Sequence, residues 1–322
     1  MLDWSDRHYR YLVRLLSRHT RVYTEMVTTG ALLYGDAQRH LDYSPEEHPI
    51  ALQLGGADPF SLAKATELAA KWGYDEVNLN CGCPSDRVQN GAFGACLMAT
   101  PELVADAVNA MQQAAPELPI TVKSRIGIDH QDDYPSFQRF VATVAESGHC
   151  GTFIVHIRKA WLSGLSPKQN REVPPLVPEF AQRIKQEYPH LNIVINGGLN
   201  TLPEMQHWAD ELDGVMVGRA AYQQTGWLSE IDPLLFNDNA PHTPESALQA
   251  YHQYCQQQVA TGTRMTALIK PILGLFHGRP GARQFRRHLS EQAPKRQQDA
   301  ELILEAFEHI APALSKTAAI SS

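Results

Sequence analysis

A cysteine followed at once by a proline comes directly after a predicted strand of this chain. Cys83 and Pro84 come after residues 76–80, EVNLN, which alternate polar and apolar side chains and predict a short strand. The Cys83 thiol therefore follows the carboxyl end of that strand. In a barrel of parallel strands this end carries the catalytic groups, so Cys83 is a candidate proton donor or nucleophile.

Three further predicted strands carry a polar side chain near the same end. Gln53, Lys123 and His156 lie within or at the end of otherwise apolar runs. The inside of a barrel is normally filled with branched apolar side chains, so a buried lysine there needs an anionic partner. A reduced flavin or a phosphate would provide one.

Glycines follow the last two predicted strands. One strand leads into Asn196-Gly197-Gly198 and the next into Gly218-Arg219. Loops at these places commonly bind phosphate in such barrels, because glycine lets backbone N–H groups approach the anion. The pattern leaves open whether a flavin mononucleotide or a sugar phosphate is bound.

Short β-branched runs alternate with helical patterns over most of the chain, which is typical of parallel βα units. The predicted strands are Arg21 to Met26, Pro49 to Leu54, Glu76 to Asn80, Ile120 to Ser124, Thr152 to His156, Asn192 to Asn196 and Gly214 to Val217. The helices predicted between them are Pro59 to Trp72, Pro101 to Ala114, Phe137 to Ser147, Val177 to Tyr188 and Pro203 to Glu211. We therefore predict an α/β fold, a (β/α)8 TIM barrel.

The first of the eight strands that such a barrel requires has no counterpart here. Only a few residues precede the first predicted helix, Asp6 to Arg18. We therefore expect the first strand to be truncated, with the chain beginning inside the first strand-to-helix loop.

Strand patterns end after about Thr243, and four helices with apolar faces follow: Glu245 to Ala260, Arg264 to His277, Ala282 to Gln292 and Gln298 to Leu314. Residues 236–243 have the turn-rich composition of a boundary. We predict a barrel domain over 1–240 and an all-α helical bundle over 241–322.

Composition narrows the class of protein. No apolar run approaches the roughly 20 residues of a membrane helix, and the first residues lack a secretory pattern, so we expect no membrane contact and a cytoplasmic protein. The five cysteines are scattered, without zinc-binding spacing, which predicts free thiols and no metal centre.

Charge is distributed unevenly. The whole chain carries −7, yet between Arg264 and Arg296 eight basic residues accompany a single acidic one, a net charge of +7. A basic segment in an acidic protein is typical of a surface that binds phosphates, although a solvated helix face has the same composition.

Taken together, these motifs resemble the tRNA-dihydrouridine synthase family over essentially the whole chain, and most closely its A subgroup. The matching segments are residues 1–7, 24–27, 53–56, 78–91, Lys123, 156–160, 196–198 and 218–219. Residues 85–91 and 160–168 favour the A subgroup, which the resemblance links to uridines 20 and 20a of the tRNA D-loop.

The resemblance implies a reaction and its cofactor. Members carry FMN in the barrel mouth, reduced by NADPH, and pass hydride from the flavin to C6 of uracil, while the cysteine at the position of Cys83 protonates C5. The FMN contacts that it implies are Gln53, Lys123, His156, Asn196, Gly197, Gly198, Gly218 and Arg219. Of the Ala-Pro-Met motif that lines the flavin in the family, only Met1 is present.

Substrate contacts are predicted in two groups. The resemblance implies that Asn80 touches the tRNA near the target base. Three basic residues follow the strand that ends at His156: Lys159, Lys168 and Arg171. Three more, Arg283, Arg286 and Arg287, lie on one helix of the bundle and are expected to bind the tRNA backbone. The target base must leave its stack to reach the pocket.

Two other functions fit part of the pattern. A dihydroorotate-dehydrogenase-like FMN enzyme acting on a free pyrimidine would explain the barrel but not the basic bundle. A catalytically idle RNA-binding barrel would explain the basic segment but not Cys83. No dinucleotide-binding glycine motif is present, so we expect NADPH to dock transiently on the flavin, and we expect a monomer.

Overall fold

The computed structural model describes residues 1–85, 91–240 and 242–310, which form two compact units. The first unit holds Met1, 21–43 and 48–217, and the second holds 2–20, 44–47 and the chain from Gly218 onward. The units do not divide at the predicted boundary near residue 240. Within the second unit, the buried Asp232 carboxylate accepts hydrogen bonds from Ser17 Oγ (2.5 Å) and the Arg18 amide (2.6 Å), which ties residues 218–240 to the first helix.

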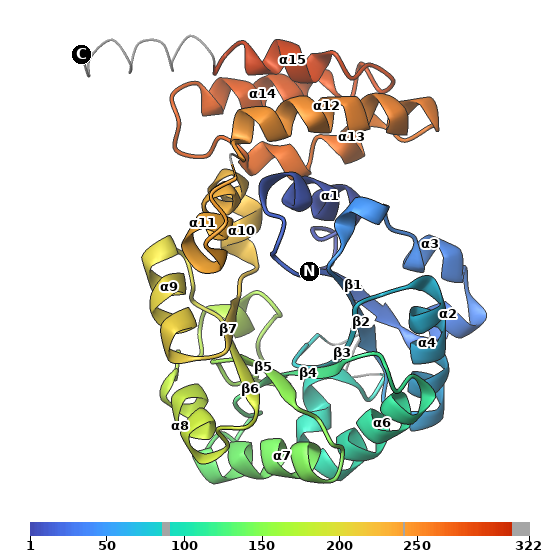
Figure 1. The fold of residues 1–322 in the computed structure, drawn as a ribbon, viewed down its shortest axis with the longest axis vertical. Helices are drawn as coiled ribbons and strands as arrows, with labels where there is room; N and C mark the ends of the chain where they lie inside the picture. The colour runs from blue at the N-terminus through green and yellow to red at the C-terminus, as the bar shows by residue number, and fades with distance from the viewer. Residues whose placement is uncertain (86–90, 241, 311–322) are drawn as a thin grey trace. The chain divides into compact units, whose positions relative to one another are not determined.

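Seven parallel strands, paired in chain order, form the sheet of the first unit. They are β1 (Val22–Thr28), β2 (Ile50–Gly55), β3 (Glu76–Cys81), β4 (Ile120–Arg125), β5 (Thr152–His156), β6 (Asn192–Asn196) and β7 (Gly214–Met216). All seven lie at the predicted runs. The sheet curls around a central axis in Figure 1, which confirms the predicted barrel-type fold.

Helices cover the outer face of this curled sheet (Figure 1). The helices of the first unit are α2 (Thr29–Tyr34), α3 (Ala37–Leu41), α4 (Pro59–Trp72), α6 (Pro101–Ala114), α7 (Tyr134–Glu146), α8 (Glu179–Glu187) and α9 (Leu202–Glu211). The sequence patterns missed α2 and α3. Their only local signals are the capping side chains of Thr28 and Asp36, each of which accepts a backbone N–H of its helix.

Capping residues fix where the long helices begin. Asp58 and Asp133 accept an amide of the first turn of α4 and α7, and a proline follows in that turn of each helix. Thr201 and Glu204 form a capping box at α9. Each helix therefore begins in the loop beyond a carboxyl strand end, where the candidate site residues lie.

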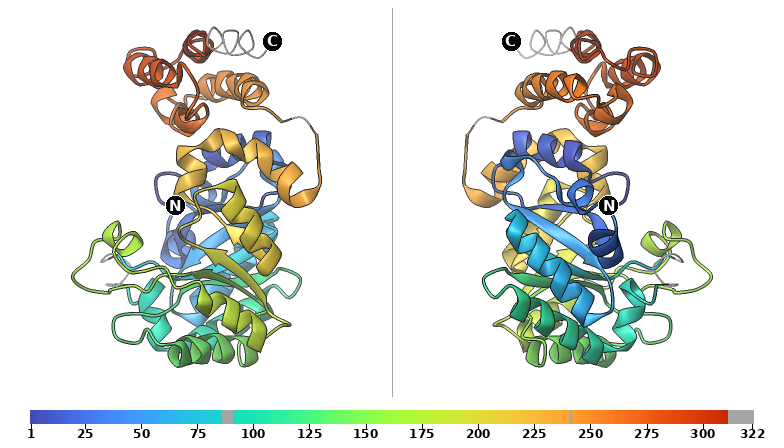
Figure 2. Two further views of the ribbon diagram at one scale, coloured as in Figure 1. Left: turned by 90° about the vertical axis from the view of Figure 1, so that its left-hand side faces the viewer. Right: turned by 90° about the vertical axis from the view of Figure 1, so that its right-hand side faces the viewer.

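The second unit is helical, and its later helices, orange to red, group together in both views of Figure 2. Its helices are α1 (Arg7–Leu16), α10 (Arg219–Gln223), α11 (Ile231–Phe236), α12 (Pro244–Ala260), α13 (Met265–Leu268), α14 (Ala282–Gln292) and α15 (Leu302–Phe307). The predicted continuous helix from Arg264 to His277 is wrong. Pro271 has no N–H to continue the α-helical pattern, and a 3-10 turn over Pro271–Gly274 follows α13.

Parts of two predictions lie outside the described residues: positions 86–90 of the motif after Cys83, and the end of the last predicted helix beyond residue 310. Among the residues that the structure does describe, none of the helices is both long and apolar enough to cross a bilayer.

Candidate active site

The site begins with strand β3, whose six residues are all buried. Side chains alternate between the two faces of a strand, so Glu76, Asn78 and Asn80 share one face and Val77 and Leu79 the other. A buried polar group is costly unless it is hydrogen-bonded. The three polar side chains of β3 are therefore expected to find partners on the neighbouring strands, and they do.

Hydrogen bonds join these side chains into a continuous ladder, which we call the β3 ladder and which comprises Glu76, Thr121, Asn78, Gln53 and Asn80. Thr121 Oγ1 donates to Glu76 Oε1 (2.7 Å) and accepts from Asn78 Nδ2 (2.8 Å). Gln53 Nε2 donates to Asn78 Oδ1 (3.0 Å), and Asn80 Nδ2 donates to Gln53 Oε1 (2.9 Å). The ladder thus runs from the start of β3 to its carboxyl end.

The far end of the ladder holds the candidate thiol in place. Asn80 Oδ1 accepts the backbone N–H groups of Gly82 and Cys83, each at 3.0 Å. Cys83 O accepts the Ala95 amide at 2.9 Å, and the half-buried Sγ lies 3.6 Å from Ser85 Oγ. An ionised carboxylate only accepts hydrogen bonds and a backbone amide only donates them. Both ends of the ladder therefore impose the same orientation on every amide between them.

Lys123 is the register neighbour of Asn80 on β4. Its Nζ donates to Asn196 Oδ1 at 2.9 Å, and Asn196 Nδ2 donates to Met216 O at 2.8 Å. Burial lowers the pKa of Lys123 to about 7, and the charge of Arg125 acts in the same direction. The lysine is therefore poised to gain a proton when an anion arrives.

His156 lies beside Asn196 in the register of β5 and β6. Burial, together with the charges of Arg125 and Lys123, lowers the pKa of His156 well below its usual value, so the imidazole is neutral at pH 7. Its buried Nδ1 has no hydrogen-bond partner among the described residues. A buried nitrogen without a partner points to a ligand that supplies one.

Gly197 and Gly198 form a left-handed turn after β6, with φ of 104° and 77°. A Cβ at Gly197 would lie 3.0 Å from His156 Nε2, and a Cβ at Gly198 would lie 2.6 Å from Leu176 Cδ1. Glycine is therefore required here both for backbone conformation and for space.

The structure brings six of the predicted residues together at the carboxyl ends of β2 to β6: Gln53, Asn80, Cys83, Lys123, His156 and Asn196. Two other predicted cofactor residues belong to the second unit, where Gly218 precedes α10 and Arg219 is its first residue. Met1 is counted with the first unit and is 37% exposed.

The predicted tRNA contacts differ in their surroundings. Lys159 Nζ is paired with Asp132 Oδ2 (2.5 Å) and lies 4.1 Å from the centre of the Trp161 ring. Lys168 and Arg171 are exposed. On α14 the buried side chains are Ala282, Phe285 and Leu289, while Arg283 and Arg287 are exposed and Arg286 is partly exposed.

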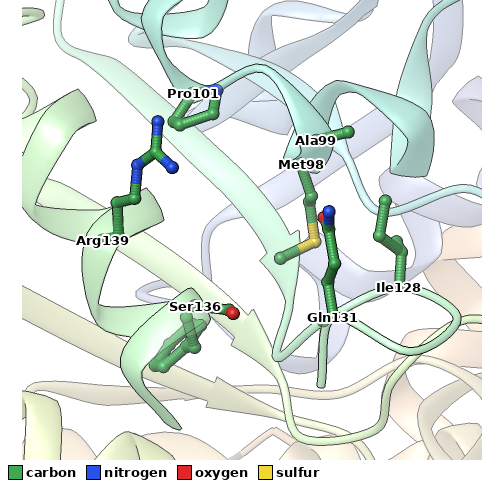
Figure 3. Close-up of a pocket in the computed structure, with 9 residues that line it drawn as sticks. Met98, Ala99, Pro101, Ile128, Gln131, Ser136 and Arg139 are labelled. Atoms are coloured by element: carbon green, nitrogen blue, oxygen red, sulfur yellow. The ribbon is translucent and has the colours of Figure 1, made fainter. Parts of the chain in front are cut away.

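Sequence reasoning missed Glu76, Asn78 and Thr121 as members of the site. The signal that could have found them is the alternation of polar and apolar side chains along β3. A separate cavity of about 120 Å³, lined in part by Met98, Gln131, Ser136 and Arg139, contains none of the predicted site residues (Figure 3).

Comparisons with known proteins agree on one family. The family model described as dihydrouridine synthase (Dus) matches residues 1–311. The tRNA-dihydrouridine(20/20a) synthase of Yersinia pestis is 52% identical over 313 residues, which span 97% of this chain and 90% of the relative. The protein of the same name from Shewanella oneidensis is 52% identical over 311 residues, 96% of this chain and 92% of the relative.

Solved structures support the fold. The structure of TcOYE with pHBA aligns with a TM-score of 0.50 at 12% identity, covering 76% of this chain and 86% of that chain. At this identity the likeness concerns the barrel fold alone.

The lowered pKa of Lys123 predicts a pH-dependent stability of the ligand-free protein. Between pH 7 and 10.5 the unfolded state holds the lysine proton and the folded state does not, so this group makes stability rise with pH across that window. The rise is at most about 1.4 kcal/mol per pH unit. In Lys123→Met this contribution is absent.

The test is the difference in melting temperature between wild type and Lys123→Met from pH 6 to 9. We expect the melting temperature of wild type to increase relative to that of Lys123→Met as the pH rises. Lys64→Met, which removes an exposed lysine, is the control and should show a constant difference. A constant difference for Lys123→Met as well would mean that Lys123 stays charged in the folded protein.

Proposed function

Because the chain belongs to the dihydrouridine synthase family, we propose that it reduces the C5=C6 bond of uridines in tRNA and so forms dihydrouridine. It is an FMN-dependent oxidoreductase. The observation that carries the proposal is the position of Cys83 at the end of the β3 ladder, with Lys123 as the register neighbour of Asn80. The names of the relatives indicate uridines 20 and 20a as the targets.

The side chains at the barrel mouth fit an anionic flavin nucleotide. Lys123 is a half-buried amine hydrogen-bonded to a neutral amide, and His156 Nδ1 lacks a partner among the described residues. The left-handed turn at Gly197 and Gly198 follows directly after Asn196, the partner of Lys123. We assign Lys123, His156 and Gln53 to the ring system of FMN and Asn196, Gly197 and Gly198 to its phosphate end. The FMN roles of Met1, Gly218 and Arg219 stay predictions.

When bound in its reduced form, FMN supplies the hydride that reduces C6 of the base. The Cys83 thiol completes the reaction by giving its proton to C5, so that both carbons become saturated and a thiolate is left. The thiolate then takes a proton from water. Asn80 holds the main chain of Cys83 throughout, which keeps the donor at a constant place relative to the barrel rim.

The hydrogen bonds of the β3 ladder also determine which donor or acceptor of the Asn80 side chain is available to a substrate base. Its Oδ1 is used by two backbone amides and one N–H by Gln53, so one N–H donor is left. We therefore propose that Asn80 contacts the target base through a carbonyl oxygen, which uracil provides.

We propose that Lys159, Lys168 and Arg171 contact the tRNA near the target and that Arg283, Arg286 and Arg287 of α14 bind its backbone phosphates. We also propose that residues 1–240 hold FMN and carry out the chemistry, while residues 241–322 provide the main tRNA-binding domain. We further propose NADPH as the reductant, a cytoplasmic location and a monomeric state.

Replacing Cys83 by alanine should remove the proton donor and little else. We expect the rate of dihydrouridine formation to fall at least about a hundredfold, with FMN content and flavin reduction by NADPH unchanged. The measurement is the dihydrouridine content of tRNA digested after reaction with the pure enzyme.

Cys96→Ala is the matched control, because Cys96 is also a partly buried thiol but its Sγ donates to Phe93 O at 3.0 Å. It should retain the wild-type rate. Full activity in Cys83→Ala would refute the assigned donor.

Replacing Arg286 and Arg287 together by glutamine should weaken tRNA binding and flatten its salt dependence. Each lost phosphate contact lowers the slope of log Kd against log salt by roughly 0.7 to 0.9. We therefore expect a slope reduced by about 1.5, measured by titration at several salt concentrations.

The control is Arg139→Gln with Arg183→Gln, two exposed arginines on α7 and α8 that pair with Glu102 and Glu187. An unchanged slope in the α14 variant would remove these arginines from the tRNA contact.

A further inference from the structure

A buried arginine at the end of β4 joins the loop of Cys83 to the loop that follows β5. Arg125 is only 4% exposed. Its Nε donates to Gly82 O at 2.9 Å, and its Nη1 donates to Lys159 O at 2.8 Å and to Asn170 O at 2.9 Å. Three of its five N–H donors are thus used by backbone carbonyls.

These carbonyls adjoin the residues assigned to chemistry and to substrate. Gly82 precedes Cys83, Lys159 is itself a predicted tRNA contact, and Asn170 precedes Arg171. The Asn170 side chain is buried and closes its own loop by accepting the Trp161 amide at 2.8 Å and donating to Trp161 O at 2.9 Å. Arg125 therefore links residues 82–83, which Asn80 holds, to the loop that Asn170 closes.

Among the described residues, the hydrogen-bond partners of Arg125 are carbonyl oxygens and not carboxylates, so its charge is not neutralised by them. Burial lowers the pKa of Arg125 to about 10, while the charge of Cys83 acts to raise it. A guanidinium with this pKa stays protonated at neutral pH, so it keeps a positive charge at the carbonyl of Gly82, one residue before Cys83.

We propose that Arg125 is a positioning residue for the reaction: it fixes the Cys83 loop against the loop of Lys159 and Arg171, and its charge stabilises the thiolate that remains after proton donation. This rests on the proposed function of Cys83 as donor. Lysine cannot replace arginine here, because a single ammonium nitrogen does not reproduce the planar spread of donors that reaches three carbonyls.

The experiment compares wild type with Arg125→Met, Arg125→Lys and the surface control Arg139→Met. The first readout is the rate of Cys83 alkylation by iodoacetamide from pH 6 to 10, followed by peptide mass spectrometry without tRNA. The second is kcat and KM for unmodified tRNA, expressed per bound flavin. Expressing kcat per flavin separates catalysis from any loss of folded protein.

We expect Arg125→Met to move the pH midpoint of alkylation upward by about one pH unit, since a nearby cation has been removed. We expect kcat per flavin to fall at least tenfold. In Arg125→Lys the pH midpoint of alkylation should return most of the way to the wild-type value, because the positive charge is present again. Its kcat per flavin should stay low, because the three hydrogen bonds are not re-formed. Arg139→Met should match wild type in both readouts.

A purely structural role would lower flavin content and melting temperature but leave the alkylation midpoint and kcat per flavin at wild-type values, and this result overturns the proposal. If Arg125→Met does not fold, a wild-type kcat per flavin in Arg125→Lys overturns it equally. Failure of the proposed function appears differently, as a wild-type enzyme that forms no dihydrouridine while its Cys83 alkylation still responds to Arg125.

Discussion

The position of Cys83 depends on the β3 ladder, a chain of hydrogen bonds that has a single orientation. Glu76 at one end accepts only, and the backbone amides of Gly82 and Cys83 at the other end donate only. Every amide between them has one orientation that satisfies its neighbours. A fully satisfied buried network is rigid, whereas a half-satisfied one is costly. The thiol is thus placed by the barrel interior and not by the loop alone.

Electrostatics at the barrel mouth favours negative charge. Arg125 is a buried cation, and Lys123 is a half-buried amine that is poised to take up a proton when an anion binds. Their hydrogen bonds go to carbonyl and amide oxygens. His156 is neutral because burial and the charges of these two residues disfavour its protonation. Such a site binds anionic ligands and stabilises charge that develops during a reaction. The same groups that we assign to the flavin nucleotide would therefore also stabilise the thiolate that the proposed proton donation leaves on Cys83. Cofactor binding and proton donation share one electrostatic environment.

Much of the fold could be predicted from the sequence, because β-branched runs and helix caps are local signals. All seven strands, and the position of Cys83 after the third of them, could be predicted from such local signals. The ladder and the Arg125 links could not be predicted, because they depend on register between strands that a single run does not reveal. The sequence indicates Gln53 and Asn80 as separate site residues, and only the pairing of β2 with β3 shows that they hydrogen-bond to each other. The grouping of α1 with the C-terminal helices was also missed, since it rests on the long-range bonds of Asp232.

In the reaction that we propose, a thiol at the barrel rim protonates a uridine of tRNA while flavin delivers hydride. The decisive experiment reduces the flavin of the pure protein without oxygen and follows its absorbance after mixing with unmodified tRNA, free uracil or orotate. We expect rapid reoxidation by tRNA, with one dihydrouridine formed per flavin oxidised, and no reoxidation by the free bases. Reoxidation by orotate but not by tRNA, or tRNA binding without reoxidation, would contradict the proposed reaction.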